Sequence, residues 1–417
     1  MLIKFLGAAD RVGGSAVLLD TGKKRFLFDY GNILDEDTRK NFQRVSYPPF
    51  EEVDAIFISH AHMDHMGGLY HLISKEFRSN IPIFMTLPTM SIGMLLLKNS
   101  IQIIDGFVNH GIMHKLYQLI NLKKYNETFN FGNYKFTFFN SGHVLGASLI
   151  YMEGDNKRIC YTGDVNTNFT LFQTGIHIPE QIKNVDLLIL ESTYALKSTP
   201  PLGEEEYKFM SAVRQAVSQG FVLIPVFAFE RSLRVSDLLI REGIDHTIVS
   251  SLIFHLILKT KSLLKGKSKR YLGKIKQHLK RKKHVLEDTH ALDKGRVILT
   301  TSGMLSGGFA LDLLPYLTSG DSVILPGYCV KGTNGRYLLD EHKVYIHGKE
   351  VNLNHVNVLN FSLSAHAPHE GLMKIVKEIN PKQICVVHGD NTSDFAKYLN
   401  DNGYNAYAPS NRESIII

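Results

Sequence analysis

The sequence predicts an α/β protein, or α+β in some classification schemes, and three observations lead to this fold class. The chain has 417 residues, 44% of them hydrophobic, which is enough to bury a large core over two or three domain-sized units. Residues 1–193 alternate short β-rich runs with turn signals, a pattern typical of stacked sheets whose loops carry function. From about Tyr194 onward, strands and helices alternate in the βαβ manner.

In the first half, strands are predicted from short runs of β-branched and aromatic residues. These runs cover residues 15–20, 25–29, 53–59, 134–139 and 148–152. A helix over Ser91 to Lys98 is expected to cover one face of the sheets. In the second half, one helix is expected to begin at Glu204-Glu205-Glu206, and another is expected around Ser232 to Glu242. Its buried strands are expected at residues 221–227, 296–299, 322–325, 356–359 and 383–388.

The string His60-Ala61-His62-Met63-Asp64-His65 places three imidazoles and a carboxylate directly after the apolar run 53–59. Imidazole nitrogen and carboxylate oxygen are the donors that zinc and related divalent ions prefer, and a turn beyond a rigid strand can aim them inward. Gly67-Gly68 follows the string. A solvated, histidine-rich turn is the alternative, but this spacing favours a metal site.

Further metal-competent side chains stand at other strand ends, next to glycines that let the backbone approach a small site. They are Asp29, His143, Asp164 and His388. With the first string they supply one trio of His60, His62 and His143 and a second of Asp64, His65 and His388, with Asp164 placed to bridge. This donor set suits a hydrolase with two metal ions, although each residue alone could be a hydrogen-bonded turn residue. Asp29 is not needed as a direct ligand in this set, so we expect it to orient a ligand imidazole.

A leaving oxygen in such a reaction also needs a proton. His366, in Phe361-Ser362-Leu363-Ser364-Ala365-His366, is the candidate donor. Glu191 is its candidate orienting partner, which would also raise its pKa. A purely structural role for both residues stays open.

The net charge of +7 is concentrated in one segment, since Lys259 to Lys283 holds 12 Lys or Arg and no acidic residue. Such a segment attracts a polyanion, with Lys269 and Arg270 as candidate contacts. A solvated helix face or loop is the alternative.

The three cysteines, Cys160, Cys329 and Cys385, are far apart and lack a C-x-x-C spacing, which argues against disulfides or a thiolate zinc site. The N-terminus shows no signal peptide, and the most apolar segment, Ile248 to Leu258, is too short to cross a bilayer. The sequence therefore predicts a cytoplasmic protein with no membrane partner.

The order of these residues resembles the β-CASP nucleases of the metallo-β-lactamase superfamily, and the resemblance covers nearly the whole chain. Outside the metal motifs it rests on strings that resemble the family's clamp domain and are not shared with small-molecule lactamases or glyoxalases. They read Pro225-Val226-Phe227-Ala228, Thr301-Ser302-Gly303-Met304-Leu305-Ser306-Gly307-Gly308 and Gly327-Tyr328-Cys329-Val330-Lys331-Gly332-Thr333-Asn334-Gly335-Arg336. The layout is similar to that of short prokaryotic ribonucleases akin to the cleavage and polyadenylation nuclease.

The resemblance implies a four-layer αββα metallo-β-lactamase fold made from residues 1–193 and 361–417, with an inserted β-CASP clamp domain at 194–360. It implies two Zn²⁺ ions per chain, although the same ligands accept manganese or iron. It makes Glu191, His366 and His388 the family's motifs A, B and C, and histidine at the third is associated with members acting on RNA.

The implied function is a zinc-dependent ribonuclease that hydrolyses phosphodiester bonds of single-stranded RNA with a hydroxide activated by two metal ions, in RNA processing or decay. Endonuclease action is favoured, while 5′-exonuclease action and association with a second copy or a paralogue stay open. The alternatives are an RNA-binding partner subunit with structural metals and a metallo-hydrolase of a small ester.

The chain departs from the family pattern at three places. Family members usually read F-A-x-G-R-x-Q-E where this chain reads Phe227-Ala228-Phe229-Glu230-Arg231-Ser232-Leu233-Arg234, so that only Arg231 keeps its expected role as an RNA contact. Ala367-Pro368 replaces the usual acidic residue after His366, and Tyr70 replaces a common proline. None of these changes removes a metal ligand, so altered substrate handling is expected rather than a dead enzyme.

Phosphate contacts are predicted at two further places in the clamp domain. Ser302 and Gly303 follow a buried strand in a glycine-rich loop that could present backbone N–H groups to a phosphate, unless it is an ordinary strand-to-helix turn. Arg336 could pair bidentately with a phosphodiester, unless it is a surface or structural residue.

Overall fold

The computed structural model describes residues 1–33, 53–75, 80–169, 172–197, 201–280 and 295–417, with the backbone alone for 277–280. The chain divides into two compact units. The first takes its described residues from Met1–Leu34, Arg39–Ser198 and Ala365–Ile417, and the second from Thr199–Ser364. The domain boundaries expected after residues 193 and 360 stay predictions.

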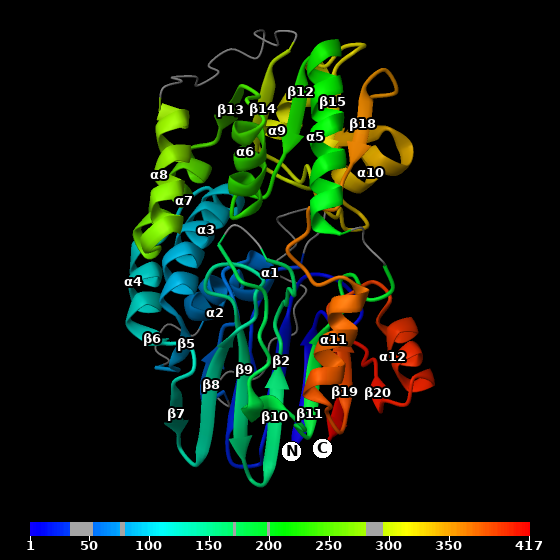
Figure 1. The fold of residues 1–417 in the computed structure, drawn as a ribbon. Helices are drawn as coiled ribbons and strands as arrows, with labels where there is room; N and C mark the ends of the chain where they lie inside the picture. The colour runs from blue at the N-terminus through cyan, green and yellow to red at the C-terminus, as the bar shows by residue number, and fades with distance from the viewer. Residues whose placement is uncertain (34–52, 76–79, 170–171, 198–200, 281–294) are drawn as a thin grey trace. The chain divides into compact units, whose positions relative to one another are not determined.

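The first unit contains a sheet of seven described strands in the order β21-β1-β2-β3-β4-β5-β6 (Figure 1). Its strands are β21 (Ser414–Ile416), β1 (Leu2–Gly7), β2 (Ala16–Asp20), β3 (Arg25–Phe28), β4 (Ala55–Phe57), β5 (Ile83–Thr86) and β6 (Ile120–Lys123). Because β1 pairs with β21, the two ends of the chain lie side by side, and the Met1 amino group donates to the Ile417 carbonyl.

A second sheet of seven described strands follows the order β20-β19-β11-β10-β9-β8-β7. Its strands are β20 (Ala406–Tyr407), β19 (Ile384–Val387), β11 (Leu187–Glu191), β10 (Lys157–Tyr161), β9 (Ser148–Gly154), β8 (Tyr134–Asn140) and β7 (Thr128–Phe131). The neighbours β10, β11, β19 and β20 are parallel, so their carboxyl ends share one edge of the sheet.

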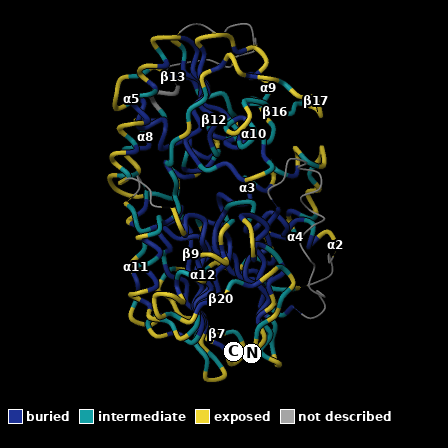
Figure 2. Tube along the Cα trace, turned by 90° about the vertical axis from the view of Figure 1, so that its right-hand side faces the viewer, coloured by how far each residue is buried: buried dark blue, intermediate teal, exposed yellow. Residues whose placement is uncertain are grey.

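The two sheets pack face to face over an aromatic core. Phe57 stacks on Phe136 of the other sheet with ring centroids 4.2 Å apart, and Phe26 meets the same ring edge-on. Burying such rings supplies a large share of the hydrophobic stabilisation. In Figure 2 much of the trace inside the sheets is buried, and the exposed trace lies on turns and on the outer sides of helices.

Helices cover the outer face of each sheet. The first sheet carries α1 (Met63–Met66), α2 (Leu69–Lys75), α3 (Leu87–Asp105) and α4 (His110–Leu119), and the second carries α11 (His369–Ile379) and α12 (Thr392–Asp401). In α11 the buried residues Leu372, Ile375, Val376 and Ile379 recur at the spacing of one helical face. The predicted four-layer αββα fold is thus confirmed.

Among the described helices, α3 alone is long and apolar enough to cross a bilayer by length and composition. Its Met94, Leu97 and Ile101 are buried in the core against the first sheet. Core packing therefore accounts for its apolar character.

The second unit is built on a parallel sheet in the order β13-β14-β12-β15-β18, which confirms the predicted βαβ alternation. Its strands are β12 (Val222–Pro225), β13 (His246–Val249), β14 (Val297–Thr300), β15 (Ser322–Leu325) and β18 (Asn357–Asn360). The helices are α5 (Leu202–Gln219), α6 (Arg231–Arg241), α7 (Ser251–Leu263), α8 (Gly266–Lys280), α9 (Phe309–Leu313) and α10 (Asn334–Glu341), and β16 (Lys343–Ile346) and β17 (Lys349–Asn352) form a hairpin.

Candidate metal centre

The metal-competent residues lie at or beyond the ends of strands of both sheets in the first unit. The string from His60 to His65 follows β4 and runs into α1, which contains Asp64 and His65, and His143 follows β8. Asp164, Glu191 and His388 stand at or just beyond the carboxyl ends of the neighbouring strands β10, β11 and β19. The topology therefore delivers residues more than 300 positions apart to one edge of the β-sandwich.

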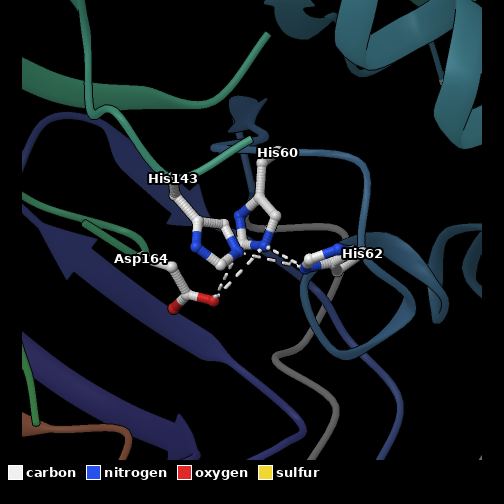
Figure 3. Close-up of side chains that lie close together, drawn as sticks. All are labelled: His60, His62, His143 and Asp164. Carbon is white, nitrogen blue, oxygen red and sulfur yellow. Dashed lines mark hydrogen bonds and ion pairs between the residues drawn. The ribbon is translucent and has the colours of Figure 1, made fainter. Parts of the chain in front are cut away.

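The first donor group consists of His60, His62, His143 and Asp164 (Figure 3). His62 Nδ1 lies 3.1 Å from His60 Nε2 and 3.2 Å from His143 Nε2. Asp164 Oδ2 lies 3.4 Å from the Nε2 atom of both His60 and His143. Three imidazole nitrogens and one carboxylate oxygen thus converge on a single point, as the tetrahedral ligation of zinc requires.

The second donor group consists of Asp64, His65 and His388. Asp64 Oδ2 lies 3.9 Å from His65 Nε2 and 3.5 Å from His388 Nε2. Asp164 reaches this group with its other oxygen, since Oδ1 lies 3.3 Å from His65 Nε2 and 3.5 Å from His388 Nδ1. One carboxylate therefore serves both groups.

Asp164 Oδ1 is buried and has no hydrogen-bond partner in the described part of the chain. An orphaned buried carboxylate oxygen is costly unless a cation or another donor completes it. This oxygen and the converging imidazoles fit the binding of two cations that share Asp164.

Two imidazoles have their outer nitrogen fixed by a group that can only accept hydrogen bonds. His65 Nδ1 lies 2.7 Å from Asp29 Oδ2, and His143 Nδ1 lies 2.8 Å from the Ala365 carbonyl. Each Nδ1 must therefore carry the proton, which leaves the Nε2 lone pair pointing into the donor groups.

Two hydroxyl groups fix two more rings in the same way. The Ser59 hydroxyl donates to Asp29 Oδ2 at 2.7 Å, so it can only accept from His60 Nδ1 at 3.0 Å. The Thr193 hydroxyl donates to the His388 carbonyl at 3.3 Å and accepts from His388 Nδ1 at 3.2 Å. Nε2 of His60 and of His388 is thereby left without a proton, and in the structure His388 Nε2 accepts a hydrogen bond from the Gly13 N–H at 3.4 Å.

Asp29 bonds to several of the groups that surround the candidate metal ligands. It is buried and has a positive φ of 57°. Besides the His65 ring and the Ser59 hydroxyl, it accepts hydrogen bonds from the Ser59 backbone N–H at 2.7 Å and the Tyr161 hydroxyl at 2.8 Å. Sequence reasoning missed Ser59, Tyr161 and Thr193. Each adjoins or lies within a motif string, but a serine, tyrosine or threonine there carries no signal of its own.

Burial and neighbouring charges set the protonation states of the donors. Burial lowers the pKa of His60 and His143 well below the ordinary value, and that of His62 to about 4. Burial opposes ionisation of Asp164, but the surrounding imidazoles, first of all His65, hold its pKa well below the usual range. Neutral imidazoles and an ionised carboxylate are the forms that bind metal ions. His65 differs from the other imidazoles: although burial acts to lower its pKa, the carboxylates of Asp164 and Asp29 raise it well above the ordinary value, so a metal ion would have to displace its proton.

His366 and Glu191 form a pair beside the donor groups. Glu191 Oε1 lies 3.0 Å from His366 Nδ1 and also accepts from the Val165 N–H at 3.1 Å, while Oε2 accepts from the Thr193 N–H at 3.0 Å. His366 Nε2 lies 3.8 Å from Asp164 Oδ2. Although burial acts to lower it, the carboxylates of Glu191 and Asp164 raise the pKa of His366 to about 9.

Four of the six candidate RNA contacts of the second unit make close local contacts. Arg231 donates to the Pro326 carbonyl, and Arg336 pairs with Asp340 at 2.7 Å. Ser302 Oγ accepts from the Ser306 N–H at 2.8 Å, and a Cβ on Gly303 would lie 2.8 Å from the Phe227 nitrogen. Lys269 and Arg270 are exposed on α8.

Three family models match the chain. A metallo-beta-lactamase superfamily domain matches residues 11–190, a Beta-Casp domain matches 241–338, and a Zn-dependent metallo-hydrolase RNA specificity domain matches 350–409. The first spans the strands and loops that carry every donor except His388, which lies in the third.

Relatives extend over the full chain. A "Probable RNase MJ4" of Methanocaldococcus jannaschii is 29% identical and covers 100% of both chains, and an "RNase J-like protein" of the same organism is 30% identical over 94% of this chain and 93% of its own. "RNase aCSPSF2" of Saccharolobus solfataricus is 28% identical over 99% and 85%. A solved structure from Enterococcus faecalis, of a protein of unknown function, has a TM-score of 0.59 at 16% identity over 100% and 99%, which shows the fold alone.

Proposed function

This chain belongs to the β-CASP family of the metallo-β-lactamase superfamily and is a metal-dependent hydrolase; we propose that it is a zinc-dependent ribonuclease that cleaves single-stranded RNA. The observation that carries the proposal is the pair of donor groups that share the Asp164 carboxylate. The full-length relatives named as ribonucleases and the matched RNA specificity domain support RNA as the substrate.

The side chains proposed to hold the two ions are His60, His62, His143, Asp164, Asp64, His65 and His388. Two divalent cations bound there would supply a nucleophile at neutral pH and offset the charge that develops on the attacked phosphoryl group. The protein's contribution is to fix the donors, because Asp29, Ser59, Thr193 and the Ala365 carbonyl hold the imidazoles in the ligating tautomer.

His366 is proposed to donate a proton from Nε2 to the leaving oxygen. Its Nδ1 is held by Glu191, which is itself anchored by two backbone N–H groups, so the ring presents its other edge towards Asp164. Glu191 thus acts as a positioning residue, and His366 is the proposed general acid.

All of the proposed metal ligands come from one chain. The three cysteines are buried free thiols, which accords with a reducing compartment and with our proposal of a cytoplasmic location.

The test measures metal content and RNA cleavage together. We expect elemental analysis to find two zinc ions per chain, and the loaded protein to cut labelled single-stranded RNA. Substrates with a 5′-monophosphate, with a 5′-triphosphate and in circular form should all be cut if the attack is internal. A folded protein with two bound ions and no cleavage of any RNA would contradict the proposal. An RNA-binding subunit with structural metals would then remain as the better account.

A further inference from the structure

Helices α7 and α8 of the second unit carry a concentration of positive charge that the metal centre does not use. Within residues 259–276 there are eight basic side chains and no acidic one. They are Lys259, Lys261, Lys265, Lys267, Lys269, Arg270, Lys274 and Lys276, called here the basic face. Six of these side chains are exposed, and the other two, Lys261 and Lys276, are half-buried.

The two helices present these charges on one side because their apolar residues pack beneath. Leu272 and Ile275 of α8 are buried, as are Ile253, Leu256 and Ile257 of α7, and the helices contact each other (Figure 1). A Cβ built on Gly273 of α8 would lie 3.5 Å from Lys261 Nζ of α7. Lys261 therefore lies over α8, and the basic face continues across both helices.

None of the eight basic side chains pairs with a carboxylate of the described residues. Lysines and arginines elsewhere do pair, such as Lys24 with Asp54 at 2.5 Å and Arg25 with Asp20 at 2.6 Å. Like charges also stand four residues apart on α8, at Arg270 and Lys274, an arrangement that destabilises a helix. The basic face is thus uncompensated within the described structure.

We propose that the basic face of α7 and α8 binds the phosphate backbone of the RNA substrate, an inference that rests on the proposed ribonuclease function. Lysine and arginine side chains in such a cluster release counterions from a polyanion without reading its bases. Tyr271 is the one aromatic residue within the segment, so stacking on bases contributes little. The contact is therefore non-specific and sensitive to salt.

A membrane surface is the competing occupant, and the packing of the helices argues against it. An interfacial helix inserts an exposed apolar face below the headgroups. Here the apolar residues Leu272 and Ile275 are 0% and 1% exposed, because they pack inside the unit. The exposed residues of α8 are mostly Lys and Arg, which fits a soluble polyanion.

The test compares two full-length variants with the same change in net charge. One replaces Lys267, Lys269, Arg270 and Lys274 with Gln, and the control replaces Lys4, Lys98, Lys124 and Lys377, which are exposed in the first unit, with Gln. Binding to an unstructured fluorescent RNA is followed by anisotropy at several salt concentrations, with Asp64→Asn in both variants to prevent cleavage.

We expect the basic-face variant to bind at least about tenfold more weakly at 0.1 M salt and to lower the slope of log K against log salt by about 2 to 3. With Asp64 intact, its KM for long RNA should rise while kcat stays unchanged. The control variant should keep most of the affinity and the slope.

Equal slopes for the two variants would overturn the inference. So would loss of binding to vesicles of phosphatidylglycerol and phosphatidylcholine with unchanged binding to RNA. If the unmodified protein cleaves RNA but the slopes agree, only this inference fails; if it neither binds nor cleaves RNA, the proposed function fails as well.

Discussion

The two units use the residues that the sequence singles out in opposite ways. In the first unit the motif residues converge, and Asp164 Oδ1 remains buried without a hydrogen-bond partner among the described residues. In the second unit Arg231, Ser302 and Arg336 are each engaged by a neighbouring backbone or side-chain group. The Asp164 carboxylate and the imidazoles of the first unit converge, whereas the three side chains of the second unit bond to nearby groups of the same unit.

This difference teaches that polar motif residues mark a site only where their hydrogen-bonding capacity is left over. A buried carboxylate oxygen without a donor costs free energy, and at Asp164 bound cations would offset that cost. A serine that accepts a hydrogen bond within its own loop, or an arginine that pairs with a residue one helical turn away, has less hydrogen-bonding capacity left for a ligand. The four predictions below test this contrast, from the largest expected effect to the smallest.

Asp164→Asn should have the largest effect, because it removes the charge that both donor groups share. We expect both metal ions to be lost and kcat/KM to fall on the order of 10⁴-fold, as for other central catalytic residues. Elemental analysis and an RNA cleavage assay measure the two quantities. Asp186→Asn, which breaks an ion pair with Lys382 in the same unit, is the control and should keep both ions. Two ions retained in the Asp164 variant would refute the shared-carboxylate arrangement.

His366→Ala should lower kcat by about 10² to 10⁴-fold while leaving the metal content unchanged, because His366 is proposed to move a proton and not to hold an ion. Glu191→Gln should reproduce part of the loss, since it weakens the hold on His366 Nδ1. His177→Ala changes an exposed histidine of the same unit and should be silent. Full cleavage activity in the His366 variant would contradict its proposed role and show that another group protonates the leaving oxygen.

Sequence reasoning predicted the elements of the fold well because most strands are short apolar runs with clear turn signals. The expected helix at 232–242, for example, is α6 at Arg231–Arg241. The strand expected at 322–325 is β15, which covers the same residues. The grouping of the seven candidate metal ligands also agrees with the sequence analysis, because these histidines and aspartates follow strands whose ends meet; that they bind metal ions stays a prediction.

The residues around those donors could not be predicted in the same way. Ser59 acts through one hydroxyl that donates to Asp29 and accepts from His60, and Tyr161 acts through a hydroxyl bond to Asp29 from the other sheet. Such roles depend on how two sheets pack, and a single serine or tyrosine in a strand has many ordinary uses. The local contacts of Arg231 and Ser302 could not be predicted from the sequence for the same reason.

Ser59→Ala should show how much the layer outside the donors contributes. It removes the acceptor that fixes the His60 tautomer and a donor to Asp29, so metal affinity should fall about 10 to 100-fold. Competition with a chelator measures the affinity directly. Ser141→Ala is a matched control, because its buried hydroxyl has no hydrogen-bond partner in the described structure, and it should leave the affinity nearly unchanged. Equal affinities for the two variants would mean that the tautomer is fixed by something else.

Glu230→Gly addresses the departure from the family pattern in the second unit, where the smallest effect is expected. Glu230 has φ 62° and ψ −53°, and the Arg231 N–H donates to the Phe229 carbonyl at 2.8 Å, which closes a strained γ-turn around it. A non-glycine residue in this region costs about 1 to 3 kcal/mol, partly offset because glycine makes the unfolded chain more flexible. We therefore expect a gain of about 1 kcal/mol, seen as a rise of about 2 to 4 °C in the unfolding temperature of this unit. Glu378→Gly, inside α11, should instead lose about 1 kcal/mol. A loss of stability at position 230 as well would show that the buried Glu230 carboxylate stabilises the second unit by more than the strained turn destabilises it. Buried polar contacts would then stabilise this unit, as they do around the metal centre.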